Sequence, residues 1–184
     1  MQNNYGSICD AVAKLKNKYK QTDPFKLCEA MGISVLLRNM GSRDGACKGF
    51  FLKQSRIRCI TINSALSPVL QRIICAHELG HAILHQTKTG IKAFHDFAMF
   101  DENTQNEKEA NVFAAELLLD DEAVNSALNE DITFFQAASI LLVPIELLDF
   151  KFRVMKWKGY KLMDPPITAS SDFIRSLNAL RNNI

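Results

Sequence analysis

The chain has 184 residues, of which 47% are apolar and 23% charged, so it is long enough to bury a core in one main domain. Its 22 basic and 20 acidic residues leave a formal charge of +2, so the overall charge does not point to nucleic acid or a membrane as the principal partner. The five cysteines are widely spaced without a Cys-x-x-Cys pair, and neither a signal-peptide pattern nor an apolar span of ~20 residues is present. These features predict reduced thiols and a cytoplasmic location.

The first half of the chain predicts two helices followed by a small meandering sheet. Apolar residues first recur at helical spacing with lysines opposite, and then β-branched and aromatic runs alternate with turn residues. The predicted elements are helices at 7–20 and about 23–32, and strands at 33–39, 47–53 and 56–63.

The second half predicts helices almost throughout. Ser67 and Pro68 are typical of a helix start, and this helix is expected to continue to Gln86. Another helical pattern covers about 104–119, and further helices extend to about 158. The segment that follows is expected to be an extended tail with one weak helix near the end.

The stretch CAHELGHAILH, positions 75–85, places His77 and His81 one turn apart on a helix that is apolar on nearly every side. Two imidazoles at this spacing can bind one divalent ion, and Glu78 between them can act on water at that ion. The alternative is a pair of buried histidines with a chance glutamate. Gly80 costs a helix roughly 1 kcal/mol relative to alanine, so another element is expected to pack closely against it.

A zinc site of this type needs a third protein ligand. The helical phase favours Glu107, which continues the apolar stripe of the later helix, although an acid near a helix start can also be explained by the helix dipole. Asn111, one turn further on, is positioned to hydrogen-bond a liganding histidine or Glu107. The other candidates considered are His95, Asp101, Glu102, Glu109 and Glu116.

Two histidines remain outside this set. His85 lies near His81 in helical phase and could orient a ligand or bind the oxyanion, but a packed histidine at the helix end is favoured. His95 is interpreted as a surface histidine of a variable loop.

HELGHAILH followed by EKEANVFAAELLL resembles the ImmA/IrrE family of metallopeptidases, and TDPFKLCEAMGISV, the KGFF strand and the lead-in ITINSALSPVLQRIICA agree with it. The resemblance covers roughly positions 5–160. It implies His77, His81 and Glu107 as metal ligands and Glu78 as catalytic base. One departure is Asp120, which stands where relatives often have proline; this affects a helix end and no catalytic role.

The fold expected from these observations is α+β. A zincin-like metallopeptidase core, with a small three-stranded sheet packed on helices, is assigned to residues 1–130. A helical annex with a helix-turn-helix-like pattern, packed on the core, is assigned to 131–161, and the C-terminal tail to 162–184.

The resemblance implies a zinc-dependent endopeptidase, with Mn²⁺ or another divalent ion as the alternative cofactor. Its expected partner is a protein substrate cut at one site, a helix-turn-helix repressor of a mobile element or stress regulon. The alternative function is a regulatory module that binds a repressor or DNA and has a structural or weakly active metal site. An extended substrate needs a free sheet edge, for which 49–53 or 58–62 is the hypothesis.

The annex contains two helical segments joined through Val143 and Pro144. Its second helix is largely apolar, which favours a packing role over contact with nucleic acid or docking of a partner protein. The basic residues that nevertheless keep nucleic-acid contact open are Lys151, Arg153, Lys156, Lys158 and Lys161.

Overall fold

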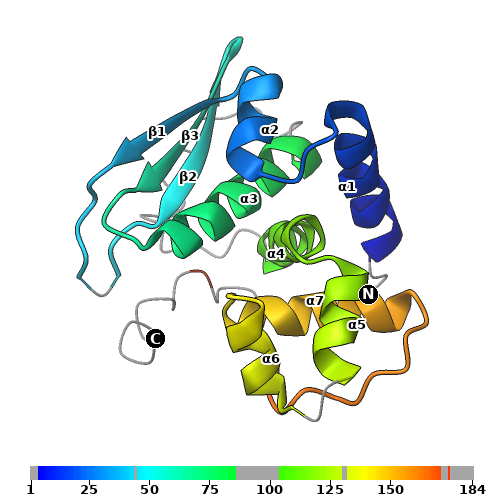
Figure 1. The fold of residues 1–184 in the computed structure, drawn as a ribbon. Helices are drawn as coiled ribbons and strands as arrows, with labels where there is room; N and C mark the ends of the chain where they lie inside the picture. The colour runs from blue at the N-terminus through cyan, green and yellow to red at the C-terminus, as the bar shows by residue number, and fades with distance from the viewer. Residues whose placement is uncertain (1–3, 44, 86–103, 130–131, 171–173, 175–184) are drawn as a thin grey trace.

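The computed structural model of this chain describes residues 4–43, 45–85, 104–129, 132–170 and 174. These residues form helices and one small mixed sheet, which confirms the α+β class (Figure 1). None of the helices in these ranges combines the length and apolar character that crossing a membrane requires. The elements are α1 (Tyr5–Tyr19), α2 (Pro24–Ala30), β1 (Ser34–Arg38), β2 (Gly49–Gln54), β3 (Ile57–Asn63), α3 (Pro68–Leu84), α4 (Thr104–Leu118), α5 (Asp121–Asn129), α6 (Phe134–Ile140) and α7 (Ile145–Trp157).

The strands lie in the order β1-β3-β2, so β3 is the middle strand. β2 runs antiparallel to β3, with Gly49 opposite Ile62, and β1 runs parallel to β3. The predicted meander is wrong in this respect, because β1 and β2 are not neighbours. Ser55 and Arg56 alone join β2 to β3, and Ser55 has the left-handed φ of 54° that a tight turn uses. This hairpin occupies one side of β3 and leaves the other side to β1.

The connection between β1 and β2 is held by one buried amide. The side-chain oxygen of Asn63 accepts a hydrogen bond from the backbone nitrogen of Met40 at 3.0 Å. Its side-chain nitrogen donates to the carbonyl oxygens of Gly41 at 2.8 Å and Cys47 at 2.9 Å. Asn63 is fully buried, and these bonds satisfy its polar atoms while fixing both ends of the connection.

Helix α3 lies between the sheet and helix α4. The hydroxyl of Ser67 caps its first turn by accepting a hydrogen bond from the nitrogen of Leu70 at 3.4 Å. One side of α3 packs on β2 and β3, and the other packs on α4, which Figure 1 shows end-on between α3 and α7. This double burial explains why α3 is apolar on nearly every side.

Helix α4 packs closely against α3 at Gly80. A Cβ atom at position 80 would lie 3.1–3.2 Å from three atoms of Phe113, a fully buried side chain of α4. The close packing expected from this glycine is therefore confirmed. A larger residue at position 80 would require Phe113 to shift within the packed interior.

The annex consists of two helices, α6 and α7, as the sequence predicts. Thr133 and Gln136 form a reciprocal capping box at the start of α6. Leu147, Leu148 and Phe150 of α7 are fully buried, and α7 packs against α4. One cluster of buried apolar side chains runs through α1, α3, α4 and α7. The annex thus contributes to the same core as the helices of the first 130 residues.

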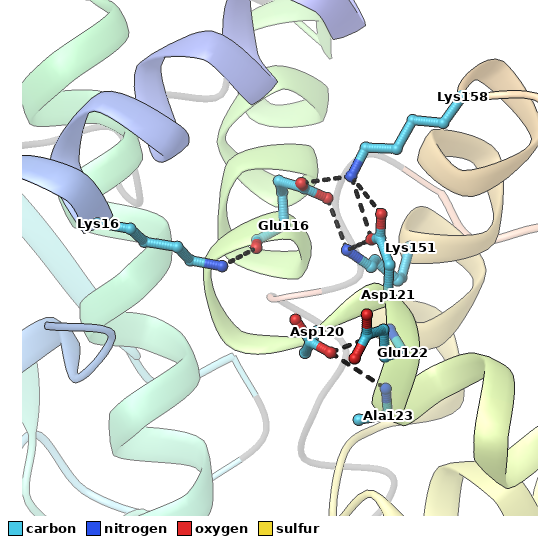
Figure 2. A network of polar contacts seen from close by, with 8 residues as sticks. All are labelled: Lys16, Glu116, Asp120, Asp121, Glu122, Ala123, Lys151 and Lys158. Carbon is cyan, nitrogen blue, oxygen red and sulfur yellow. Dashed lines mark hydrogen bonds and ion pairs between the residues drawn. The ribbon is translucent and has the colours of Figure 1, made fainter. Parts of the chain in front are cut away.

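Basic side chains of the annex are bound by acids of the chain itself (Figure 2). The ammonium of Lys151, only 1% exposed, lies 2.6 Å from Glu116 and also pairs with Asp121. Lys158 reaches the same two acids at 2.6 and 2.8 Å, and Lys16 of α1 donates to the backbone oxygen of Glu116 at 3.0 Å. This charge network joins α1, α4, α5 and α7, and it supports the packing role of the annex.

Asp120 begins the next helix. Its carboxylate accepts hydrogen bonds from the backbone nitrogens of Glu122 at 3.0 Å and Ala123 at 3.2 Å, at the first turn of α5 (Figure 2). Asp120 therefore stands at a helix start, where aspartate is a favoured cap.

The start of the tail lies along α7. Asp149 accepts a hydrogen bond from the backbone nitrogen of Ala169, and Arg153 donates one to the carbonyl oxygen of the same residue, both at 2.8 Å. The described part of the tail, 162–170, contains no helix or strand, as predicted. The weak helix expected near the chain end lies outside the described residues, apart from position 174.

We expect Gly80→Val to lower the free energy of unfolding by about 1–3 kcal/mol, because the added methyl groups collide with Phe113 in a packed interior. Chemical denaturation measures this loss. Ala123→Val, at an exposed position of α5, is the control and is expected to change stability by about 0.5 kcal/mol or less. Equal effects of the two substitutions would contradict the close helix contact.

We expect the stabilisation by Asp121 to depend on pH. Burial alone would raise the pKa of Asp121, but Lys151 and Lys158 lower it below the ordinary 3.8. A carboxyl group with a lowered pKa stabilises the fold above its unfolded pKa, and this contribution disappears as the pH falls through its folded pKa. Asp121→Asn should therefore lower stability most at neutral pH, and less as the pH drops below about 4.

Urea denaturation across this pH range measures the difference between Asp121→Asn and the unmodified chain. Asp10→Asn, at an exposed position of α1, serves as the control and should show little difference at any pH. A destabilisation by Asp121→Asn that stays constant down to about pH 3 would exclude the charge pairing as its cause.

Candidate metal centre

Two imidazole rings of α3 face the same point. The Nε2 atoms of His77 and His81 are 3.0 Å apart, and their ring centroids are separated by 4.7 Å. The side chain of His77 is 3% exposed and that of His81 is 18% exposed, so the pair is open to solvent mainly on the His81 side. One helical turn between the two residues produces this alignment.

Helix α4 brings a carboxylate to the two rings. Glu107, in the first turn of α4, lies with one carboxylate oxygen 3.3 Å from Nε2 of His77 and the other 3.4 Å from Nε2 of His81. One potential ligand atom from each of the three residues lies within 4.8 Å of the others. The contact between Gly80 and Phe113 lets α4 approach closely enough for this arrangement.

The three side chains fit a divalent ion. Ligands bound at about 2.0–2.1 Å to a tetrahedral zinc ion lie about 3.4 Å from one another, close to the separations that His77, His81 and Glu107 already have. Burial alone would raise the pKa of Glu107, but the two histidine rings beside its carboxylate hold that pKa well below its usual range. The cluster therefore offers two imidazole nitrogens and one ionised carboxylate, a set that suits zinc and leaves a fourth position open.

Glu78 occupies the turn between the two histidines and faces the sheet. It is 8% exposed, and its Cγ atom lies 3.8 Å from where a Cβ atom would stand on Gly49, the first residue of β2. The same glycine lacks room for a side chain, because its Cβ would come within 2.4 Å of Ile74. The glycine thus allows the start of β2 to lie directly beside Glu78.

Glu116, another candidate ligand on α4, does not lie at this cluster. Glu116 belongs to the charge network of Lys151 and Lys158, two turns and more beyond Glu107 on α4. Asn111 is fully buried on α4, and its expected hydrogen bond to a ligand stays a prediction. His95, Asp101 and Glu102 lie outside the described residues.

Glu109 pairs with His85, an arrangement that the sequence interpretation missed. Nε2 of His85 lies 3.1 Å from a carboxylate oxygen of Glu109. Nδ1 of His85 lies 3.0 Å from Nδ1 of His81. His85 stands at the C-terminal end of α3, as expected, but its ring is engaged in polar contacts rather than only packed. The contact between His81 and His85 could be predicted from their four-residue spacing. The contact with Glu109 could not, because it depends on how α4 lies on α3.

Comparison with known proteins agrees with this geometry. The model of the IrrE N-terminal-like domain, Peptidase_M78, matches residues 28–153. The chain is 35% identical over 147 residues to "Uncharacterized immunity region protein 2" of Bacillus phage phi105, which covers 80% of this chain and 90% of the phage protein. It is 29% identical over 129 residues to "Metallopeptidase ImmA" of Bacillus subtilis (strain 168), covering 69% of this chain and 73% of that protein. The matched segment includes every described residue of the candidate centre, and the chain belongs to the Peptidase_M78 family of IrrE N-terminal-like domains.

Proposed function

We propose that this chain is a zinc-dependent endopeptidase that makes a site-specific cut in a protein substrate. The convergence of His77, His81 and Glu107 from two helices is the observation that carries the proposal. These three residues are the proposed metal ligands, and Glu78 is the proposed catalytic base. Membership of a metallopeptidase family supports the assignment.

The residues have separate tasks in this proposal. When bound, a zinc ion supplies Lewis acidity, which activates water and polarises the scissile carbonyl; Mn²⁺ or another divalent ion is the alternative. Glu78 accepts a proton from the attacking water and delivers it to the nitrogen of the leaving amine. Its side chain is buried beside the start of β2.

The position of β2 favours it as the strand that aligns the substrate. Residues 58–62 cannot do so, because β3 pairs with a strand on each side. Within the described ranges, β2 pairs only with β3, so its outer edge can hydrogen-bond an extended peptide. A peptide added along Gly49–Gln54 would pass beside Glu78.

We propose a helix-turn-helix repressor of a mobile element or stress regulon as the substrate. The resemblance to the ImmA/IrrE family suggests this class of target, and the names of the two relatives, an immunity region protein of a phage and a metallopeptidase, support it. The acids that bind Lys151 and Lys158 leave these residues poorly suited to hold DNA, which favours an enzyme over a DNA-binding module.

We expect the purified chain to bind about one zinc ion, and His77→Ala or Glu107→Ala to lose most of it, because each removes one of three ligands. Elemental analysis after dialysis measures the content. Glu122→Ala, an exposed position on α5, is the matched control and should retain the ion. Full zinc content in both site variants would refute the ligand assignment.

We expect Glu78→Gln to retain zinc and to cut, at least about 100-fold more slowly, a helix-turn-helix repressor that the wild-type chain cleaves, because glutamine cannot accept the proton. Mass spectrometry of the repressor after incubation measures the cut, and Glu122→Gln is the control. A wild-type chain that binds the repressor without cutting it would favour the regulatory binding module instead.

A further inference from the structure

A second layer of polar contacts lies behind one of the proposed metal ligands. The ring nitrogen of His81 that faces away from the centre, Nδ1, lies 3.0 Å from Nδ1 of His85. The other ring nitrogen of His85, Nε2, lies 3.1 Å from a carboxylate oxygen of Glu109. The second oxygen of Glu109 accepts a hydrogen bond from the side chain of Gln105 at 3.0 Å.

The direction of these hydrogen bonds follows from the acid at their end. Each oxygen of the Glu109 carboxylate lies at hydrogen-bond distance from a nitrogen, 3.0 Å from Nε2 of Gln105 and 3.1 Å from Nε2 of His85, and a carboxylate can only accept hydrogen bonds. Nε2 of His85 must then carry a proton and donate it to Glu109. A neutral His85 has its lone pair on Nδ1, where it accepts the proton of His81 Nδ1.

These proton positions determine which ring nitrogen of His81 can bind a metal ion. With its proton on Nδ1, the ring presents the lone pair of Nε2 to the point that His77 and Glu107 also face. That is the tautomer a metal ligand requires. The outer nitrogen of His77, in contrast, is buried without a hydrogen-bond partner in the described structure. The second layer therefore acts on one histidine of the pair.

We propose that His85 and Glu109 are positioning residues that fix the tautomer and the ring orientation of His81 for metal binding. This inference rests on the proposed function of the centre. It assigns two tasks to the first turns of α4, which supplies Glu107 as a ligand and Glu109 as the anchor of His85. It also assigns a role to His85, which follows His77 and His81 at the same four-residue spacing.

The first test reads the tautomer directly. In zinc-loaded protein labelled with ¹⁵N-histidine, NMR should show His85 neutral, protonated on Nε2 and unprotonated on Nδ1. In Glu109→Ala the preference of His85 for that tautomer should weaken, while Glu122→Ala should leave it unchanged. A wild-type His85 that is protonated on Nδ1 would overturn the proposal, and this measurement needs no substitution in α3.

The second test measures zinc affinity by competition with a chelator. We expect His85→Leu to weaken zinc binding about 10- to 100-fold, because the supporting acceptor is lost. His85→Gln should stay within about threefold of the unmodified chain, since its amide can accept from His81 and donate to Glu109. Unchanged affinity in a folded His85→Leu, or equal losses in both variants, would overturn the positioning role.

These outcomes are separable from failure of the proposed function. If the wild-type chain holds zinc but cuts no repressor, the peptidase assignment fails. The tautomer of His85 and the difference in zinc affinity between His85→Gln and His85→Leu still decide the role of His85. If His85→Leu does not fold, the spectrum of the wild-type chain and of Glu109→Ala decides it.

Discussion

The close contact between α3 and α4 is the constraint on which the rest of the structure depends. Gly80 gives α4 room to bring Phe113 against the backbone of α3, and the same approach brings Glu107 to the two histidines. At its other end α4 is held by the charge network around Glu116 and Lys151. Helix α4 is therefore secured by apolar packing in its middle and by buried ion pairs near its end. Helix α4 therefore contributes both to the packed core and to the proposed metal site.

The core of the candidate centre could be predicted from the sequence because it depends on local geometry. His77 and His81 lie one turn apart on a single helix, so their alignment needs only helical spacing, and the phase of the next helix favoured Glu107. The pair formed by His85 and Glu109 could not be predicted in the same way. It depends on the rotation of one helix against another, which spacing within each helix does not encode.

The fold shows the same division between local and long-range information. The helices and the three strands occur where the apolar patterns indicated, with ends that differ by a few residues. The order of the strands differed, because pairing of β1 with β3 is a contact between distant segments, which periodicity along one strand cannot reveal. The basic residues of the annex were also ambiguous in sequence. Only the positions of Glu116 and Asp121 explain why Lys151 is buried and why Lys158 is paired with acids of the chain itself.

The attachment of the tail has a consequence for how this region can vary among relatives. Asp149 and Arg153 bind the peptide nitrogen and the carbonyl oxygen of Ala169, atoms that nearly every amino acid provides. Ala169 is 7% exposed, so the side chain at this point must stay small. Replacements at position 169 that keep the side chain small should therefore preserve this attachment, whereas an insertion between α7 and Ala169 would displace the two backbone atoms that Asp149 and Arg153 bind.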